Sequence, residues 1–200
     1  MSNPLERARY LLAAHTVKQL PPDDGAEVAF AGRSNAGKSS ALNALCRQNA
    51  LARVSKTPGR TQQLVYFELP QFPGRYLVDL PGYGYAKVPQ ALQAHWQSFI
   101  DGYFRNRASL RGLVVVMDIR HPLKDYDRQM LDYAVRRGLP AHVLLTKADK
   151  LSRGAATAAV LAVRRELESS GGGIGVQAFS AESKLGVEEA RAVVAGWLGL

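Results

Sequence analysis

Short apolar runs alternate with amphipathic segments through most of the chain. Each apolar run has about the length of a β-strand, and polar or turn-forming residues separate one run from the next. We expect strands at Glu27–Gly32, Leu64–Leu69, Arg75–Leu80, Leu113–Asp118, His142–Thr146 and Ile174–Phe179.

The amphipathic segments between these runs have the spacing of helices. In the longest one, Trp96, Phe99 and Tyr103 recur every three or four residues, which predicts one face in the core. Ser152 precedes another segment and is a suitable N-cap. We expect helices at Ser39–Arg47, Val88–Arg107, Lys124–Arg137, Arg153–Ser169 and Val187–Leu200.

This order of elements predicts an α/β fold with three layers, in which helices cover both faces of a mostly parallel six-stranded sheet. The link between Leu64–Leu69 and Arg75–Leu80 is so short that this pair must be antiparallel, which makes one strand run against the rest. Residues 1–24 are predicted to be an N-terminal extension, and residues 25–200 a single domain.

The chain is strongly basic, with 26 Lys and Arg against 17 Asp and Glu and a formal net charge of +9. Such a charge favours a polyanionic partner, although many basic proteins bind no nucleic acid. The lone Cys46 excludes an internal disulfide, and no apolar run approaches the roughly 20 residues of a membrane span. We therefore expect a cytoplasmic protein that does not insert into membranes.

Gly32–Ser39 reads GRSNAGKS and matches the pattern G-x-x-x-x-G-K-[ST] between a predicted strand and a predicted helix. In such a loop, backbone N–H groups and the helix N-terminus surround phosphate groups. Lys38 would reach the β- and γ-phosphates, and the Ser39 hydroxyl would bind Mg²⁺. The loop predicts a nucleoside triphosphate site without choosing the base.

Asp79–Gly82 reads DLPG at the end of a predicted strand. Asp79 could bind Mg²⁺ through water, and the Gly82 N–H could meet the γ-phosphate. Between this motif and the phosphate loop lies KTPGRTQQ, in which Thr61 is our candidate for closing over the Mg²⁺ and Thr57 is the alternative.

Thr146–Asp149 reads TKAD and also follows a predicted strand. Asp149 can accept hydrogen bonds from the N1–H and 2-amino groups of guanine, which adenine cannot donate, so the motif predicts GTP rather than ATP. The stem of Lys147 can cover the base, and a backbone N–H at Ser180–Ala181 can meet guanine O6.

Tyr83 stands where many switch GTPases have the glutamine that orients the attacking water, so we expect slow intrinsic hydrolysis. Asn35 could hold K⁺ beside the phosphates as a substitute for an arginine finger. The alternative is that Asn35 only stabilises the loop. Arg33 and Arg60 could also supply charge, although each is expected to face solvent or a partner.

The segments GRSNAGKSS, TPGRTQ, DLPGYGYAKV, DIRHP and TKADK, in this order, resemble the EngB family (also called YsxC or YihA) of bacterial GTPases, in the TrmE–Era–EngA–YihA–Septin class. The resemblance implies a single G domain, and from the motifs we expect catalytic roles for Lys38, Asn35, Thr61 and Gly82. It implies Mg²⁺ on Ser39 and Thr61. The implied nucleotide contacts are Gly32, Arg33, Ser34, Asn35, Ala36, Gly37, Lys38, Ser39, Gly59, Arg60, Thr61, Gln62, Gln63, Asp79, Leu80, Pro81, Gly82, Thr146, Lys147, Ala148, Asp149, Phe179, Ser180 and Ala181.

The resemblance further implies a role in assembly of the large (50S) ribosomal subunit and a requirement for cell division and septation. The expected partners are GTP, GDP and a 50S precursor with its rRNA and ribosomal proteins, and we expect a monomer. A regulator that acts directly on the division septum is the alternative.

Overall fold

A computed structural model of the chain describes residues 3–52, 63–82, 90–169 and 173–200. Its strands are β1 (Arg9–Ala14), β2 (Ala26–Gly32), β3 (Leu64–Glu68), β4 (Arg75–Asp79), β5 (Leu110–Asp118), β6 (Ala141–Thr146) and β7 (Gly175–Ala178). Its α-helices are α1 (Lys38–Leu45), α2 (Gln90–Asn106), α3 (Asp125–Arg137), α4 (Arg153–Glu168) and α5 (Val187–Leu198). Short 3₁₀ helices cover Val17–Gln19 and Ala148–Lys150.

The strands form one sheet in the order β1-β3-β4-β2-β5-β6-β7. β3 is antiparallel to both of its neighbours, and the other pairs are parallel. The predicted α/β class with one antiparallel strand is therefore confirmed.

The prediction of six strands is wrong, because the described residues form seven. β1 lies inside the segment 1–24, which we expected to be an extension, and it pairs with β3 from Arg9↔Glu68 to Ala14↔Leu64. Just before it, Leu5 and Ala8 are buried in the core beside α1 and α5. The sequence gives little sign of β1 because an edge strand that is half exposed on both faces has no clean alternation of apolar and polar residues.

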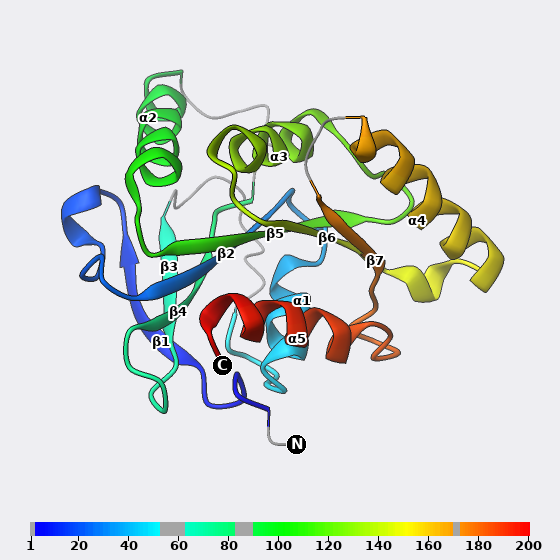
Figure 1. The fold of residues 1–200 in the computed structure, drawn as a ribbon, viewed down its shortest axis with the longest axis horizontal. Helices are drawn as coiled ribbons and strands as arrows, with labels where there is room; N and C mark the ends of the chain where they lie inside the picture. Colours follow the sequence, from blue (N-terminus) through cyan, green and yellow to red (C-terminus); the bar gives the residue numbers. More distant parts are fainter. Residues whose placement is uncertain (1–2, 53–62, 83–89, 170–172) are drawn as a thin grey trace.

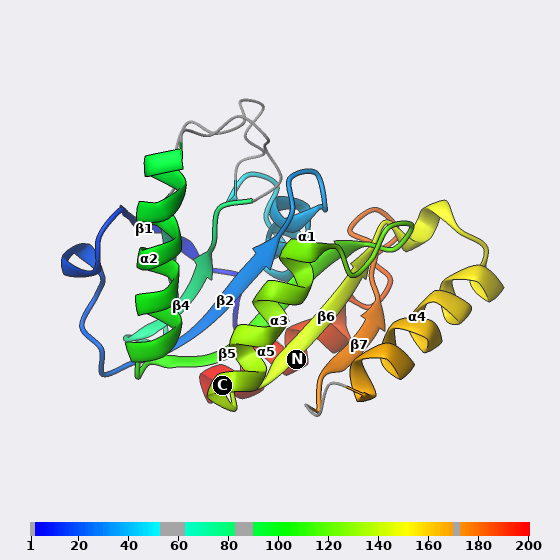
Figure 2. The same ribbon diagram turned by 90° about the horizontal axis from the view of Figure 1, so that it is seen from above.

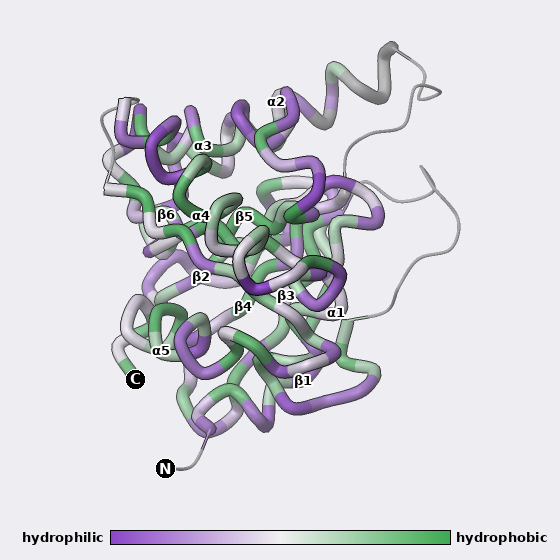
Figure 3. Tube along the Cα trace, turned by 90° about the vertical axis from the view of Figure 1, so that its right-hand side faces the viewer, coloured by the Kyte–Doolittle hydropathy of each residue, from purple (hydrophilic) through white to green (hydrophobic). Residues whose placement is uncertain are grey.

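Helices α2, α3 and α4 cover one face of the sheet, and α1 and α5 cover the other (Figures 1 and 2). Alternate residues of the central strand β2 reach the two layers, with Val28 and Phe30 toward α1 and α5, and Ala29 and Ala31 toward the opposite face. Figure 3 shows hydrophobic residues along the strands between the two helical layers. This two-sided burial explains the nearly continuous apolar runs in the sequence.

The predicted helices are confirmed, with ends that shift by at most two residues where the structure describes them. α4 begins after Ser152, whose hydroxyl accepts the Ala155 N–H, as expected for an N-cap. Phe99 and Tyr103 of α2 are buried as predicted, whereas the start expected at Val88 lies outside the described residues.

A buried polar cluster joins β2, β3 and α2 at the amino end of the sheet. The Glu27 carboxylate has no exposed surface, and it accepts hydrogen bonds from Tyr66 Oη (3.1 Å), Tyr103 Oη (3.0 Å) and Arg107 Nε (2.8 Å). Asp23 accepts the N–H groups of Ala108 (2.9 Å) and Ser109 (2.7 Å) just after α2. Arg107, which stands in the densest group of arginines in the sequence, is thus a core residue and not part of a basic surface.

Candidate functional site

Apart from Gln63, the predicted site residues that the structure describes lie at or just after the carboxyl ends of β2, β4, β6 and β7. These strands run parallel in one sheet, so their carboxyl ends share one edge, where ligands of open α/β sheets usually bind. The sheet topology therefore brings together segments that are more than a hundred residues apart in the sequence.

The loop between β2 and α1 has the backbone geometry of a phosphate cradle. Gly37, directly before α1, has φ +90°, and Asn35 has φ 62°, a left-handed conformation that asparagine tolerates well. The Ala36 N–H donates to the Arg33 carbonyl (3.0 Å), which closes the turn. A side chain at Gly32 would place its Cβ 2.9 Å from the Val116 carbonyl oxygen, so only glycine fits there.

Lys38, the first residue of α1, forms an ion pair with Asp79 at the end of β4. Both side chains are mostly buried, with exposed fractions of 11% and 16%. The two meet because β2 and β4 are neighbours, with Phe30 opposite Asp79. The phosphate-loop lysine and the carboxylate of DLPG therefore lie side by side.

The rest of DLPG also packs against the phosphate loop. Leu80 is buried and donates its N–H to the Phe30 carbonyl (2.9 Å). A Cβ on Gly82 would lie 3.2 Å from the Ser34 backbone nitrogen, so the glycine allows the two backbones to approach closely.

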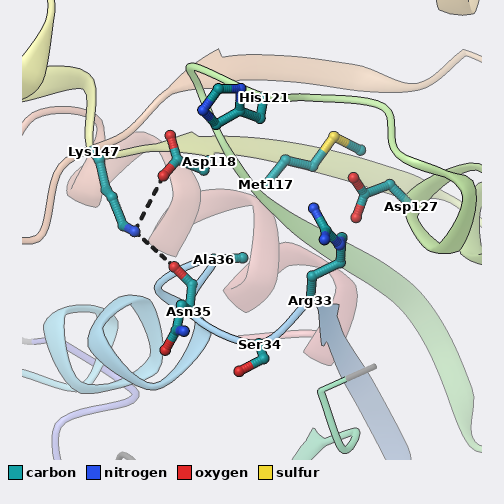
Figure 4. A pocket seen from close by; sticks show the side chains of 9 residues that line it. All are labelled: Arg33, Ser34, Asn35, Ala36, Met117, Asp118, His121, Asp127 and Lys147. Carbon is teal, nitrogen blue, oxygen red and sulfur yellow. Dashed lines mark hydrogen bonds and ion pairs between the residues drawn. The ribbon is translucent and has the colours of Figure 1, made fainter. Parts of the chain in front are cut away.

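Thr146 and Lys147 join the end of β6 to the same loop. Thr146 Oγ1 donates to the carbonyls of Ala36 and Met117. Lys147 Nζ donates to the Asn35 carbonyl (2.7 Å) and pairs with Asp118 Oδ2 (3.1 Å), as Figure 4 shows. The motif expected to read the base is thus bonded directly to the motif expected to bind phosphate.

Asp149 is fixed by the loop that follows β7. Ser180 Oγ donates to Asp149 Oδ1 (2.6 Å), and this bond is the main reason why the pKa of Asp149 is lowered, so the carboxylate stays ionised. The Ala148 N–H donates to the Phe179 carbonyl (3.1 Å). The Ser180 N–H donates to the Leu185 carbonyl (3.0 Å), which leaves Ala181 as the residue of this pair to meet the base.

A small pocket lies between the phosphate loop and the start of α3. It is lined by Arg33, Ser34, Asn35, Ala36, Met117, Asp118, His121, Asp127 and Lys147. Arg33 extends toward Asp127 and Met117 (Figure 4), so its side chain does not simply face solvent as expected.

Asp127 is a buried carboxylate of this pocket that the sequence did not single out. Its Oδ2 accepts the Lys124 N–H (3.0 Å), whereas its Oδ1 has no hydrogen-bond partner among the described residues. Burial raises the pKa of Asp127 to about 6. The one signal in the sequence was a carboxylate three residues into a predicted helix, which is a capping pattern.

Several predicted contacts lie outside the described residues, namely Thr57, Gly59, Arg60, Thr61, Gln62 and Tyr83. Gln63 is described, and its Nε2 lies 2.6 Å from Nε2 of His15, just after β1. The N-terminal segment therefore contacts a residue two positions after the candidate switch threonine in the sequence.

The chain resembles known proteins over its whole length. A family described as "50S ribosome-binding GTPase" matches residues 27–147. The chain is 73% identical, over all of both chains, to "Probable GTP-binding protein EngB" of Stenotrophomonas maltophilia (strain K279a). It is 70% identical to the protein of the same name from Xanthomonas axonopodis pv. citri (strain 306), with 100% of this chain and 93% of the relative covered.

Solved structures share the fold at low sequence identity. One titled "Crystal structure of a probable GTP-binding protein engB" has a TM-score of 0.67 and 20% identity, and the match covers 87% of this chain and 99% of that one. The bacterial selenocysteine-specific elongation factor EF-Sec has a TM-score of 0.61 and 19% identity over 88% of this chain and 29% of its own. In the described part of the chain, no helix is long and apolar enough to cross a membrane.

Proposed function

The chain belongs to the EngB family of GTP-binding proteins, and we propose that this P-loop GTPase acts as a molecular switch in assembly of the 50S ribosomal subunit. Membership of the family confirms the resemblance drawn from the sequence, and GTP hydrolysis comes with it. The residues that bind nucleotide and the cellular role are the proposal.

One observation carries the assignment of the nucleotide site. Thr146 and Lys147 donate hydrogen bonds to carbonyls of the phosphate loop, and Asp149 in the same motif is held by Ser180. These bonds hold the phosphate loop and the Asp149 carboxylate at a fixed distance from each other, as the binding of one nucleotide across both groups requires.

In this proposal Lys38 exchanges Asp79 for the β- and γ-phosphates when GTP binds. Backbone N–H groups of Gly32–Ser39 surround the phosphates, and the Gly82 N–H meets the γ-phosphate. Asp149 accepts two hydrogen bonds from guanine. The test is binding of GDP and ADP to the purified chain by calorimetry. Equal affinities would contradict the assignment of Asp149.

Mg²⁺ would be held by Ser39 and Thr61 and, through water, by Asp79. Ser39 follows Lys38 on α1, and Lys38 contacts Asp79, so the Ser39 hydroxyl and the Asp79 carboxylate lie in the same region. These donors fit Mg²⁺, which usually binds few protein ligands, all of them oxygen. When bound, Mg²⁺ neutralises charge on the phosphate oxygens. Thr61 lies outside the described residues, so its place rests on the sequence.

Asn35 is proposed to hold K⁺ beside the phosphates. Its left-handed backbone and exposed side chain are compatible with this role, and they suit the alternative, a residue that only stabilises the turn, equally well. Hydrolysis rates in K⁺ and Na⁺ at equal ionic strength separate the two. Equal rates would rule out the K⁺ role, and slow rates in both salts would agree with the absence of glutamine at position 83.

The ribosomal role is supported by the family description and by the net charge of +9, which suits an rRNA partner. We propose that the protein works in the cytoplasm as a monomer. Depletion of the protein followed by sucrose-gradient analysis tests the role. Accumulation of 50S precursors before cells form filaments supports it, whereas normal ribosome profiles with early failure of septation support the direct division regulator.

A further inference from the structure

We propose that Asp118 is a positioning residue for nucleotide binding, because its carboxylate holds the Lys147 ammonium against the phosphate loop so that the lysine stem lies where the base must rest. The inference rests on the guanine site proposed above. Asp118 is not among the residues that the sequence motifs assign to that site.

The sheet places the two residues side by side. Asp118 ends β5 and Lys147 directly follows β6, and the neighbouring pair in the parallel register is Asp118↔Thr146. Lys147 has φ 59°, a left-handed conformation that is unfavourable for a residue with a side chain. This backbone fixes the direction in which the lysine stem leaves the chain.

Two acceptors hold the other end of the stem. Lys147 Nζ donates to the Asn35 carbonyl at 2.7 Å and lies 3.1 Å from Asp118 Oδ2. Figure 4 shows both interactions at the mouth of the pocket. A free lysine side chain loses rotamer entropy when a ligand orders it, so anchoring both ends prepares the stem before the ligand arrives.

Asp118 is itself held in place and charged. Arg120 donates to it from Nε (3.0 Å to Oδ1), from Nη2 (2.7 Å to Oδ2) and from its backbone N–H (3.0 Å to Oδ1). These bonds, and the pairing with Lys147, hold the pKa of Asp118 well below its usual range. Lys147 therefore has an anionic partner at every physiological pH.

The two carboxylates of the site then have separable roles. Asp149 faces the edge of the base and distinguishes guanine from other purines. The lysine stem contacts the face of the ring, which is apolar in every purine. Loss of Asp118 should therefore weaken the binding of all purine nucleotides by the same factor. Disturbance of Asp149 should instead change the ratio of their affinities.

The test compares GDP with IDP, which lacks the 2-amino group of guanine, by titration calorimetry on the full chain. Asp118→Asn keeps the size of the side chain but removes its charge. We expect about tenfold weaker binding of both nucleotides, with the GDP-to-IDP ratio unchanged, because a hydrogen bond to a charged group is lost. Ser180→Ala, which frees Asp149, should instead change that ratio.

A double-mutant cycle shows whether Asp118 acts through the lysine. We expect Asp118→Asn with Lys147→Ala to bind GDP no more weakly than Lys147→Ala alone. Arg120→Ala is the matched control. It removes the side-chain bonds of Arg120 but keeps the backbone N–H that holds Asp118 and the pair with Lys147, so we expect less than a threefold change.

Unchanged GDP binding in Asp118→Asn, or additive losses in the double variant, would overturn the inference. Should Asp118→Asn unfold, Asp118→Glu moves the charge by one methylene, and a loss of threefold or more for both nucleotides supports the proposal while wild-type affinity overturns it. If the wild-type chain itself binds neither nucleotide, the proposed guanine site has failed instead.

Discussion

The two ends of the sheet both carry ion pairs, but the pairs differ in what surrounds them. At the amino end, Arg107 and Glu27 are 7% and 0% exposed, and Tyr66 and Tyr103 also donate to the same carboxylate. At the carboxyl end, Lys38 and Asp79 retain 11% and 16% exposure and lie where loops begin. The same kind of ion pair is therefore sealed from water at the amino end and lies close to the surface loops at the carboxyl end.

The difference shows how burial separates a structural pair from a functional one. At the amino end the Glu27 carboxylate has no access to water that could replace its partners, so loss of one partner leaves a buried charge uncompensated. A lysine at the rim of the sheet can leave its carboxylate for a phosphate at little cost, because water and loop backbone are close by. We therefore expect substitutions at the amino end to reduce stability and those at the carboxyl end to reduce activity.

Glu27→Gln should give the largest loss of stability. The change leaves the buried Arg107 guanidinium with only the partly exposed Asp23, 3.4 Å away, as its counter-charge. Removal of one partner of a buried pair costs about 3–5 kcal/mol, and Asp23 should keep the loss near the lower end of that range. Chemical denaturation measures the free energy of unfolding. Glu68→Gln is the matched control, because its partner Arg9 is 67% exposed, and the expected loss is below about 1 kcal/mol. Equal losses in the two variants would contradict the distinction between the ends.

Lys38→Ala should have the opposite profile. We expect the rate of GTP hydrolysis to fall by about 100-fold or more, because the lysine stabilises charge on the transferred phosphate, while the free energy of unfolding changes by less than about 1 kcal/mol. Phosphate release and thermal unfolding are the two measurements. Lys18→Ala, an exposed lysine of the first 3₁₀ helix, controls for charge removal. Loss of folding in Lys38→Ala would show that the open pair is structural.

Asp127 combines features of both ends, since it is buried like the amino-end cluster but one of its carboxylate oxygens has no hydrogen-bond partner in the part of the chain that the structure describes. Its pKa is raised from 3.8 to about 6, so in the folded protein it keeps a proton that the unfolded chain has released. The stabilisation that the protonated Asp127 gives to the folded state is fully present below about pH 4 and is lost as the pH rises through 6. Relative to the wild type, Asp127→Asn should therefore gain up to about 2 kcal/mol in unfolding free energy between pH 4.5 and pH 7.5.

Denaturant titrations at the two pH values measure this gain. Asp125→Asn removes an exposed carboxylate from the same helical turn and should show a smaller change with pH. A stability difference between Asp127→Asn and the wild type that stays constant with pH would show that Asp127 is ionised in the folded chain throughout this range.

The parallel strands and the helices could be predicted because burial on both faces leaves a strong apolar pattern. The edge strand β1 could not, because its pairing with β3 depends on backbone groups that no side-chain pattern records. The burial of Arg107 could not be predicted either, because it depends on the contact with Glu27, which lies 80 positions away in the sequence.

The sequence by itself determined the local chemistry of this protein. The phosphate loop, the carboxylate of TKAD and the glycines each lie within a single turn, so their positions in the sequence also fix their distances in space. The tertiary structure decided which of these groups meet. The pairs Lys38–Asp79, Lys147–Asp118 and Arg107–Glu27 join residues 41, 29 and 80 positions apart. Their formation depends on which strands become neighbours, because charges act over a few ångströms and only the packed sheet brings such distant segments that close.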